Sequence, residues 1–349
     1  PGLKYNPQQR VDFYSRLQTR LRALPGVQSV SAMTGLPPLR NVVANDTDFE
    51  HIPNNRPAGS TPIENVDFYQ FVSVGYVETM GIPVLQGRGF EEQDIAGAPA
   101  VMINETLAKK FFTDRDPIGG HIRPGGPANQ PWFTVVGVLK DVKSGGVTEA
   151  AGTELYMLTD QIPKASNFAP TNMNFVVRST MPLSSLANEY RRAVQELDPT
   201  LPLIRMRSMD AVIGDAIARP RFLTVLLGIF AGLALVLAAV GTYGILAYLV
   251  TERKQEIGIR MALGADRGKV LRLVLGRGLL LSGIGLVIGL AASLGLTRVM
   301  ATLLFNVTPT DPFTLASVAA VIALVAAAAC IIPAWRATRV DPLTVLRDN

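Results

Sequence analysis

Few side chains in this sequence have the type and spacing that catalysis or metal binding requires. The chain holds two histidines and one cysteine. His51 and His121 stand in no metal-ligand spacing, so we expect both in surface loops. Cys330 has no partner for a disulfide within the chain, and no serine stands in the G-x-S-x-G pattern of a nucleophile elbow. The sequence therefore predicts no catalytic residue, no metal and no cofactor, and it argues against an enzyme.

A glycine-rich stretch from Gly264 to Lys269, GADRGK, resembles a phosphate-binding loop only in part. That loop has four residues between its glycines, and a Ser or Thr follows the lysine because its hydroxyl holds Mg²⁺. Here three residues separate Gly264 from Gly268, and Val270 follows the lysine. We therefore expect no ATP binding through this segment.

A short amphipathic helix fits the same region better. Apolar and charged side chains recur there at three- and four-residue spacings: Ile257, Met261 and Leu263 against Arg253, Glu256 and Arg260. Gly264 stands where a helix could end in a left-handed cap. Such a helix could lie along a membrane face and dock into a groove of a partner. The alternative is a basic loop that only fixes the membrane topology.

The composition divides the chain at about residue 220. Overall, 48% of the residues are hydrophobic and 17% are charged, unlike an ordinary soluble enzyme. Three long uncharged runs follow the division, at 222–251, 278–297 and 312–335. About 20 apolar residues cross the ~30 Å hydrocarbon core of a bilayer. We therefore predict transmembrane helices at about 222–250, 278–304 and 312–335; three buried core helices are the disfavoured alternative.

The basic residues predict the orientation of these helices. The loop 251–277 and the C-terminal tail are rich in Lys and Arg, whereas the loop 298–311 has only Arg298 and Asp311. The positive-inside rule places the first two in the cytoplasm and residues 1–215 outside. The net charge of +5 is explained by this topology, so no nucleic-acid partner is needed.

The start of the sequence adds one expectation. It opens at Pro1, with no signal peptide and no hydrophobic run near it. Because an external domain must be translocated, we expect a first membrane helix that is missing from this sequence.

The region 1–215 has the pattern of a mixed α+β domain. Val11, Tyr14, Leu17 and Leu21 recur at helical spacing, and 27–33 then alternates like a strand. A similar combination of strand and helix recurs near the end of this region, with strands at 172–179 and 201–208 around an amphipathic helix at 182–197.

A separate block lies between these two cycles. It has strand-like runs at 68–74 and 132–139, a short helix that Asn104 caps, and loops at 113–131. We therefore predict two subdomains, an outer one of about 1–62 and 150–210 and an inserted one of about 63–149.

The three uncharged runs are rich in small residues, and their polar side chains are those of Ser, Thr, Tyr243, Tyr248 and Cys330. Gly228 and Gly232, and likewise Gly285 and Gly289, have the G-x-x-x-G spacing that lets helices approach closely. Ion and solute pathways through a bilayer need charged or strongly polar groups. These helices are therefore predicted to pack together and to transmit motion, and not to form a pore.

Several segments resemble the FtsX/MacB-like permeases, the membrane subunits of ABC transporters that work by mechanotransmission. EIGIRMALGADRGKV (256–270) and PAWRATRVDPLTVLR (333–347) resemble the signature and the ending of the FtsX-like permease domain, here 216–349. GYVETMGIPVLQGRGFEEQD (75–94), VMINETLAKKFF (101–112), DPIGGHI (116–122) and FTVVGVLKDV (133–142) resemble the MacB-type periplasmic core domain, here 1–215. The resemblance covers nearly the whole chain.

The resemblance implies a unit of four membrane helices whose loop after the second carries a coupling helix that docks on an ATPase. By motif match the coupling helix consists of Glu256, Ile257, Gly258, Ile259, Arg260, Met261, Ala262, Leu263, Gly264 and Ala265. ATP would be hydrolysed in a separate chain or domain. The segment 218–264 also resembles the duplicated orphan permeases, in which case this sequence is the C-terminal half and its energy source stays open.

Two functions of different class follow. The first is an ABC permease subunit of the bacterial inner membrane that exports a substrate, with an ATPase, a second permease copy and a periplasmic adaptor or outer-membrane protein as partners. The second is a signalling or scaffold protein that regulates a periplasmic partner, such as a cell-wall hydrolase, and transports nothing. The sequence identifies neither the cargo nor the oligomeric state.

Overall fold

The computed structural model describes residues 4–52, 64–125, 131–201, 206–252, 259, 267–299 and 312–337. The chain divides into two compact units, Pro1–Ala218 and Arg219–Asn349, which we call the N-terminal domain and the helical unit. Each is described by itself.

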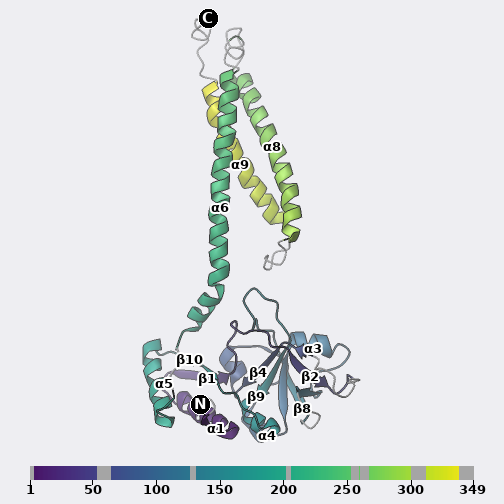
Figure 1. Ribbon diagram of the computed structural model, residues 1–349, viewed down its shortest axis with the longest axis vertical. Coiled ribbons are helices and arrows are strands. Elements are labelled where there is room, and N and C mark those ends of the chain that lie inside the picture. Colours follow the sequence, from purple (N-terminus) through teal and green to yellow (C-terminus); the bar gives the residue numbers. More distant parts are fainter. Residues whose placement is uncertain are drawn as a thin grey trace. The chain divides into compact units, whose positions relative to one another are not determined.

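The N-terminal domain contains a mixed sheet with the strand order β10-β1-β4-β9-β6-β8-β7-β2-β3, and β5 pairs with β8 outside this path. Two pairs, β4 with β9 and β6 with β8, are parallel, and the others are antiparallel (Figure 1). The strands are β1 (Val27–Met33), β2 (Asn45–Phe49), β3 (Glu64–Val66), β4 (Phe68–Val72), β5 (Val84–Gly87), β6 (Ala100–Asn104), β7 (His121–Pro124), β8 (Phe133–Leu139), β9 (Glu154–Leu158) and β10 (Asn174–Ser179).

The helices of this domain begin at polar caps where the sequence supplies them. They are α1 (Pro7–Arg22), α2 (Tyr76–Met80), α3 (Glu105–Phe111), α4 (Ile162–Ser166) and α5 (Leu183–Leu197), with short 3₁₀ turns at Glu92–Ile95 and Thr159–Gln161. Asn6 and Gln9 form a capping box at the start of α1. The side chain of Asn104 accepts a hydrogen bond from the backbone N–H of Leu107, which confirms the predicted cap of α3.

Three hydrophobic clusters stabilise the domain. Alternate residues of β6 and β9 enter two of them: Val101, Ile103, Leu155 and Met157 one, Met102, Tyr156 and Leu158 the other. Both faces of these central strands are therefore buried. The third cluster joins α1, α5 and β1 through Leu17, Leu21, Val30, Ala193 and Val194.

Sheet pairing runs across both predicted subdomains. Strand β2, expected in the outer subdomain, pairs with β7, and β9 pairs with β4 and β6. The division of the N-terminal domain into 1–62 with 150–210 and 63–149 stays a prediction.

Two local predictions were wrong. The stretch 113–131, expected as loops, contains β7, and His121 lies in that strand with its Nδ1 2.8 Å from the Glu50 carboxylate. The strand expected at 201–208 does not have these bounds: Leu201 and residues 206–208 are not in a strand, and residues 202–205 lie outside the described residues.

The helical unit consists of long helices. Helix α6 (Met209–Glu252) begins in the N-terminal domain and continues into this unit, and α8 (Arg267–Val299) and α9 (Pro312–Ala337) pack along each other (Figure 1). The fold class is thus confirmed as a mixed α/β domain followed by three long apolar helices.

Candidate functional site: the membrane helices and the buried polar core

Each of the three long helices has an apolar stretch that is long enough to cross a bilayer. The stretches lie in Met209–Glu252, Gly278–Gly295 and Pro312–Ile331. Large apolar side chains on them are exposed, among them Phe222, Leu237, Val287, Phe313 and Leu324. A helix with outward-facing apolar side chains is suited to lipid, in which its backbone bonds are already satisfied. These helices are the candidate membrane spans.

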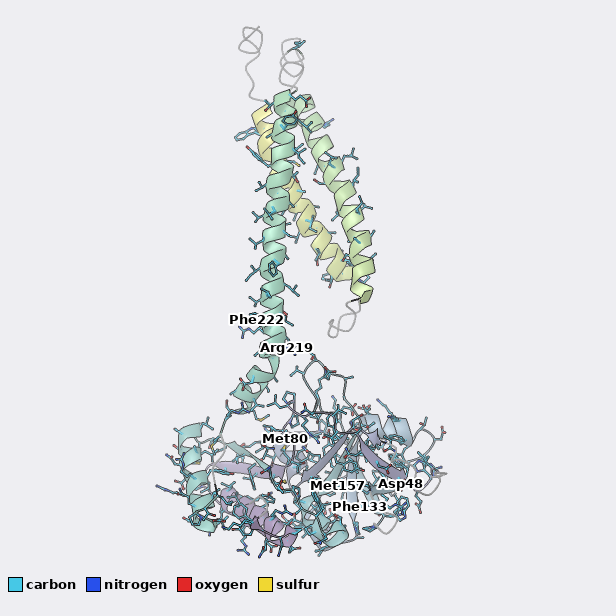
Figure 2. The ribbon with its side chains drawn as sticks, viewed as in Figure 1. Asp48, Met80, Phe133, Met157, Arg219 and Phe222 are labelled. Atoms are coloured by element: carbon cyan, nitrogen blue, oxygen red, sulfur yellow. The ribbon has the colours of Figure 1, made fainter. Side chains whose placement is uncertain are left out.

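The start of the apolar stretch of α6 is marked by basic residues. Arg219 and Arg221 flank Pro220, which lies inside the helix, and Phe222 follows (Figure 2). Arg and Lys at a helix end keep their charges in the interfacial region while the apolar residues enter the lipid. Further along, the hydroxyls of Thr242 and Thr251 donate to backbone carbonyls of their own helix, so they need no other partner in the bilayer.

The three helices meet at a glycine that the sequence analysis did not single out. A Cβ atom on Gly278 of α8 would lie 2.8 Å from Cys330 Sγ of α9 and 2.9 Å from Leu246 Cδ1 of α6. Leu246 and Cys330 are both buried. The absence of a side chain at Gly278 therefore lets side chains of two neighbouring helices approach the backbone of α8.

The glycines of the two G-x-x-x-G spacings, which were predicted to pack helices together, do not lie at this contact between the three helices. Within the described part of the chain, a Cβ added at Gly228, Gly232, Gly285 or Gly289 would meet nothing within 4 Å. Their faces are open in the single chain. Their role in packing against another copy stays a prediction.

The predicted coupling helix, Glu256–Ala265, lies outside the described residues except for Ile259. That residue is helical, and its side chain is exposed.

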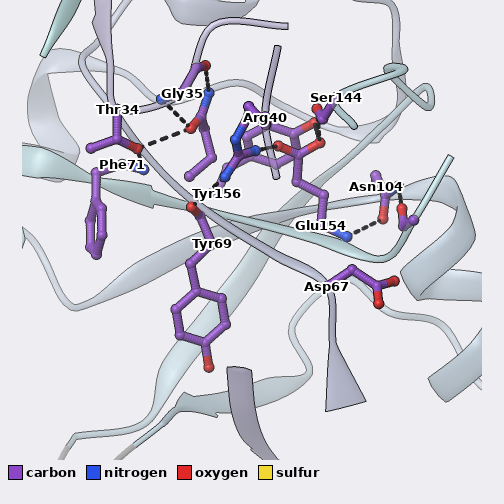
Figure 3. Close-up of polar contacts among 12 residues, drawn as sticks. Thr34, Gly35, Arg40, Asp67, Tyr69, Phe71, Asn104, Ser144, Glu154 and Tyr156 are labelled. Carbon is purple, nitrogen blue, oxygen red and sulfur yellow. Dashed lines mark hydrogen bonds and ion pairs between the residues drawn. The ribbon is translucent and has the colours of Figure 1, made fainter. Parts of the chain in front are cut away.

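A buried ion pair forms the centre of the polar core of the N-terminal domain. Arg40, from the loop 34–44, pairs with Glu154 at the start of β9, and it also donates to the Tyr69 carbonyl oxygen at 2.7 Å (Figure 3). Glu154 is 1% exposed and accepts further hydrogen bonds from Ser144 Oγ at 3.0 Å and Tyr156 OH at 2.9 Å. Burial raises the pKa of Glu154, and Arg40 and the two hydroxyls oppose that rise.

Two aspartates next to this pair hold neighbouring loops. Asp141 accepts hydrogen bonds from Asn104 Nδ2 at 2.7 Å and from the backbone and side chain of Thr106. Asp67 accepts from the backbone and side chain of Thr153 at 2.7 and 2.8 Å. The polar core thus ties the loops 34–44 and 140–153 to the sheet, a positioning role for which no motif in the sequence gave a signal.

Comparison with known families assigns both parts of the chain. Residues 5–193 match the MacB-like periplasmic core domain, and residues 228–342 match the FtsX-like permease C-terminal region. The chain belongs to the MacB-like periplasmic core domain family. It joins that domain to an FtsX-like permease region, so it is a membrane protein with a periplasmic-type domain and three candidate spans.

Relatives of this MacB-like chain include named export proteins. The pyoverdine export ATP-binding/permease protein PvdT of Pseudomonas syringae pv. tomato is 29% identical, with 94% of this chain and 49% of PvdT covered. The macrolide export ATP-binding/permease protein MacB of Azoarcus sp. is 29% identical, with 76% and 40% covered. The ABC transporter permease YknZ of Bacillus subtilis is 29% identical, with 64% and 55% covered. The chain thus matches between 40% and 55% of the length of these relatives.

Two solved structures are similar to part of the MacB-like chain. The extracellular domain of YknZ from Gram-positive bacteria has 19% identity and a TM-score of 0.37, with 53% of this chain and 83% of that chain covered. The periplasmic region of MacB from Actinobacillus actinomycetemcomitans has 17% identity and a TM-score of 0.36, with 53% and 73% covered.

Proposed function

We propose that this chain is the permease part of an ABC export system of the MacB and PvdT type. One observation carries the proposal: a MacB-like periplasmic core domain and an FtsX-like permease region occur in the same chain. Similarity over most of the chain to proteins named export ATP-binding/permease proteins supports it.

The proposed topology follows from the distribution of charge. Residues 1–215 lie in the periplasm, and the loop 251–277 and the C-terminus lie in the cytoplasm of a bacterial inner membrane, because basic loops stay on the cytoplasmic side. The chain works with a second permease copy or as one half of a tandem chain.

The proposed action is mechanical. ATP is bound and hydrolysed by an ABC ATPase in another chain or domain, which docks on the coupling segment Glu256–Ala265. Docking and hydrolysis shift the membrane helices, and α6, which reaches from the N-terminal domain into the helical unit, carries the motion to the periplasmic domain. A cargo or a periplasmic adaptor then responds to the moved domain; this chain itself catalyses no reaction.

The test is recovery of the ATPase with tagged full-length protein from membranes. We expect Glu256→Lys and Arg260→Glu to reduce recovery, since each reverses a charge on the proposed docking segment, while membrane insertion is unchanged. The matched control is Arg272→Glu, which makes the same charge change as Arg260→Glu outside the motif, on α8. Equal recovery with both motif variants and wild type would contradict the coupling role.

The same experiment separates the two function classes. An ATPase together with a periplasmic adaptor or outer-membrane protein supports export. Recovery of a cell-wall hydrolase, with no change in substrate efflux when the gene is deleted, would instead support the scaffold function.

A further inference from the structure

The first turn of α1 ends in a buried arginine. Arg10, Tyr14, Leu17 and Leu21 follow one another at three- and four-residue spacing, so they share one side of the helix. All four are buried, and Arg10 is only 7% exposed. Arginine is almost never this buried unless it is paired, and an aliphatic residue would fill the same position without an electrostatic cost.

The guanidinium of Arg10 has no partner among the described residues. It donates no hydrogen bond and forms no ion pair, and its Nε atom is fully enclosed. The terminal nitrogens Nη1 and Nη2 also lack a hydrogen bond, but they are not enclosed, so the outer edge of the guanidinium reaches the surface. Buried polar groups are nearly always hydrogen-bonded, and a buried charge without a counter-charge destabilises a fold.

The acids nearest to Arg10 along the chain do not neutralise it. The first turn of α1 contains no acidic residue. Asp12 accepts a hydrogen bond from Gln8 at 2.9 Å, and Asp198 is paired with Lys4. Arg10 also lies near the positive end of the helix dipole, which favours anions and not cations. The charge at this position therefore has no stabilising role within the domain.

The segment 167–173 lies against the same side of α1 and carries further hydrogen-bond donors. Tyr14, one turn after Arg10, donates from its hydroxyl to the Pro170 carbonyl oxygen at 3.1 Å. The next two residues, Thr171 and Asn172, are partly exposed and exposed, and within the described chain neither their backbone nor their side chains form a hydrogen bond. No acid occurs in this segment. The surface beside Arg10 thus offers neutral donors and no competing carboxylate.

We propose that the outer edge of Arg10 binds a carboxylate group that is not part of this chain. The planar fork of a guanidinium pairs with a carboxylate through two parallel hydrogen bonds. One carboxylate neutralises the single positive charge, whereas a phosphate monoester carries a charge of about −1.5 to −2. The carboxylate belongs to a small acid or to a partner protein, since both present the same group. The proposal needs no ATPase and is independent of the export function.

The test follows the unfolding of the N-terminal domain in the full chain. The chain has two tryptophans, and a Trp335→Phe background leaves Trp132 of the N-terminal domain as the fluorescent reporter. The Tm is measured in detergent while sodium acetate, or in a second series sodium phosphate, replaces sodium chloride at constant ionic strength. Arg10→Met removes the charge and keeps a flexible side chain, and Arg10→Lys keeps the charge without the fork. Arg16→Met changes an exposed arginine of the same helix and is the matched control.

We expect acetate to raise the Tm of wild type, because a ligand that binds only the folded state stabilises it. Arg10→Met should show no rise, and in chloride it should melt at or above the wild-type temperature, since it removes an unpaired buried charge. Arg10→Lys should show a smaller rise, and Arg16→Met should behave like wild type. Equal wild-type Tm values in acetate and chloride overturn the proposal, as does a rise with phosphate alone or a rise that Arg10→Met retains.

The source of the carboxylate is identified in cells. A photoreactive residue replaces Asn172, which is exposed in the segment 167–173. A protein that is crosslinked in the wild-type background and lost in the Arg10→Met background assigns the carboxylate to a partner protein. Stabilisation by acetate without any crosslinked protein assigns it to a small acid.

Discussion

Lys4 and Asp198 form an ion pair of 2.9 Å, although 194 positions separate them along the chain. The Asp198 carboxylate, 5% exposed, also accepts hydrogen bonds from Tyr5 OH and from the backbone and hydroxyl of Thr200. The segment before α1 and the segment after α5 are therefore joined at one carboxylate. This contact joins the two ends of the α1–α5 part of the N-terminal domain, and α6 begins at Met209, eleven residues after Asp198.

The ion pair of Lys4 and Asp198 predicts how the stability of the N-terminal domain depends on pH. Hydrogen bonds from Tyr5, then Thr200 and Lys4, hold the pKa of Asp198 below its ordinary value. A group with a lowered folded-state pKa adds stability above its unfolded pKa of about 4, and that stability is lost as the pH falls towards the folded value. We expect the Asp198→Asn variant to have a lower Tm than wild type at pH 7. Between about pH 5 and pH 3, its Tm should fall by less than the Tm of wild type. Parallel Tm–pH curves for the two proteins would show that Asp198 makes no such contribution.

The Arg40–Glu154 pair predicts a large cost when one partner is removed. Glu154→Gln leaves the Arg40 guanidinium buried without its counter-charge, and such a change costs about 3–5 kcal/mol of unfolding free energy. Urea denaturation followed by circular dichroism measures it as a lower midpoint. Glu149→Gln makes the same change at an exposed position in the loop 140–153, which precedes β9; it is the matched control and should stay within about 0.5 kcal/mol of wild type. If both variants unfold at one midpoint, the pair is not a stabilising anchor. The double variant Arg40→Met with Glu154→Met should recover most of the loss.

The helix contact at Gly278 predicts that a larger side chain destabilises the helical unit at this position and not at an open position of the same helix. Gly278→Val places side-chain atoms against Cys330 and Leu246, so we expect it to separate the three helices and lower the Tm of the full chain in detergent. Gly285→Val adds the same side chain to the same helix at an open position and should leave the Tm near that of wild type. Leu246→Ala in the Gly278→Val background should restore part of the loss. Equal Tm values for the two valine variants would refute the contact.

Larger side chains at Gly228 and Gly232 are predicted to affect packing between two permease copies and not the stability of a single chain. Because Gly228 and Gly232 meet no neighbour within the described part of the chain, Gly228→Leu and Gly232→Leu should leave the Tm of the monomer unchanged. If these glycines pack against another permease copy, both changes should lower the yield of copy-to-copy crosslinks in membranes. Wild-type crosslinking yields in both variants would remove the glycines from the interface.

The sequence by itself determined the features that depend on neighbours along the chain. Three long uncharged runs require lipid-facing or buried helices whatever else the chain does, and α6, α8 and α9 contain them. Local patterns also specified α1, β1 and the Asn104 cap of α3, because helical spacing, strand alternation and capping each act within a few residues. The sequence motifs that resemble the FtsX/MacB-like permeases are also short continuous segments, so they too could be identified without the tertiary structure.

The tertiary structure alone decided which distant residues meet. Strands β6 and β9 escaped prediction because both of their faces are buried, so neither shows the alternation of a half-exposed strand. Arg40 and Glu154 lie 114 positions apart, and no local pattern marks either one as the partner of the other. A G-x-x-x-G spacing shows that a helix has a small face, but not what covers it: Gly278 contacts two helices, whereas Gly228 and Gly285 contact none in the described chain. Contacts between distant residues depend on the path of the whole chain, and that path is fixed only when the core packs.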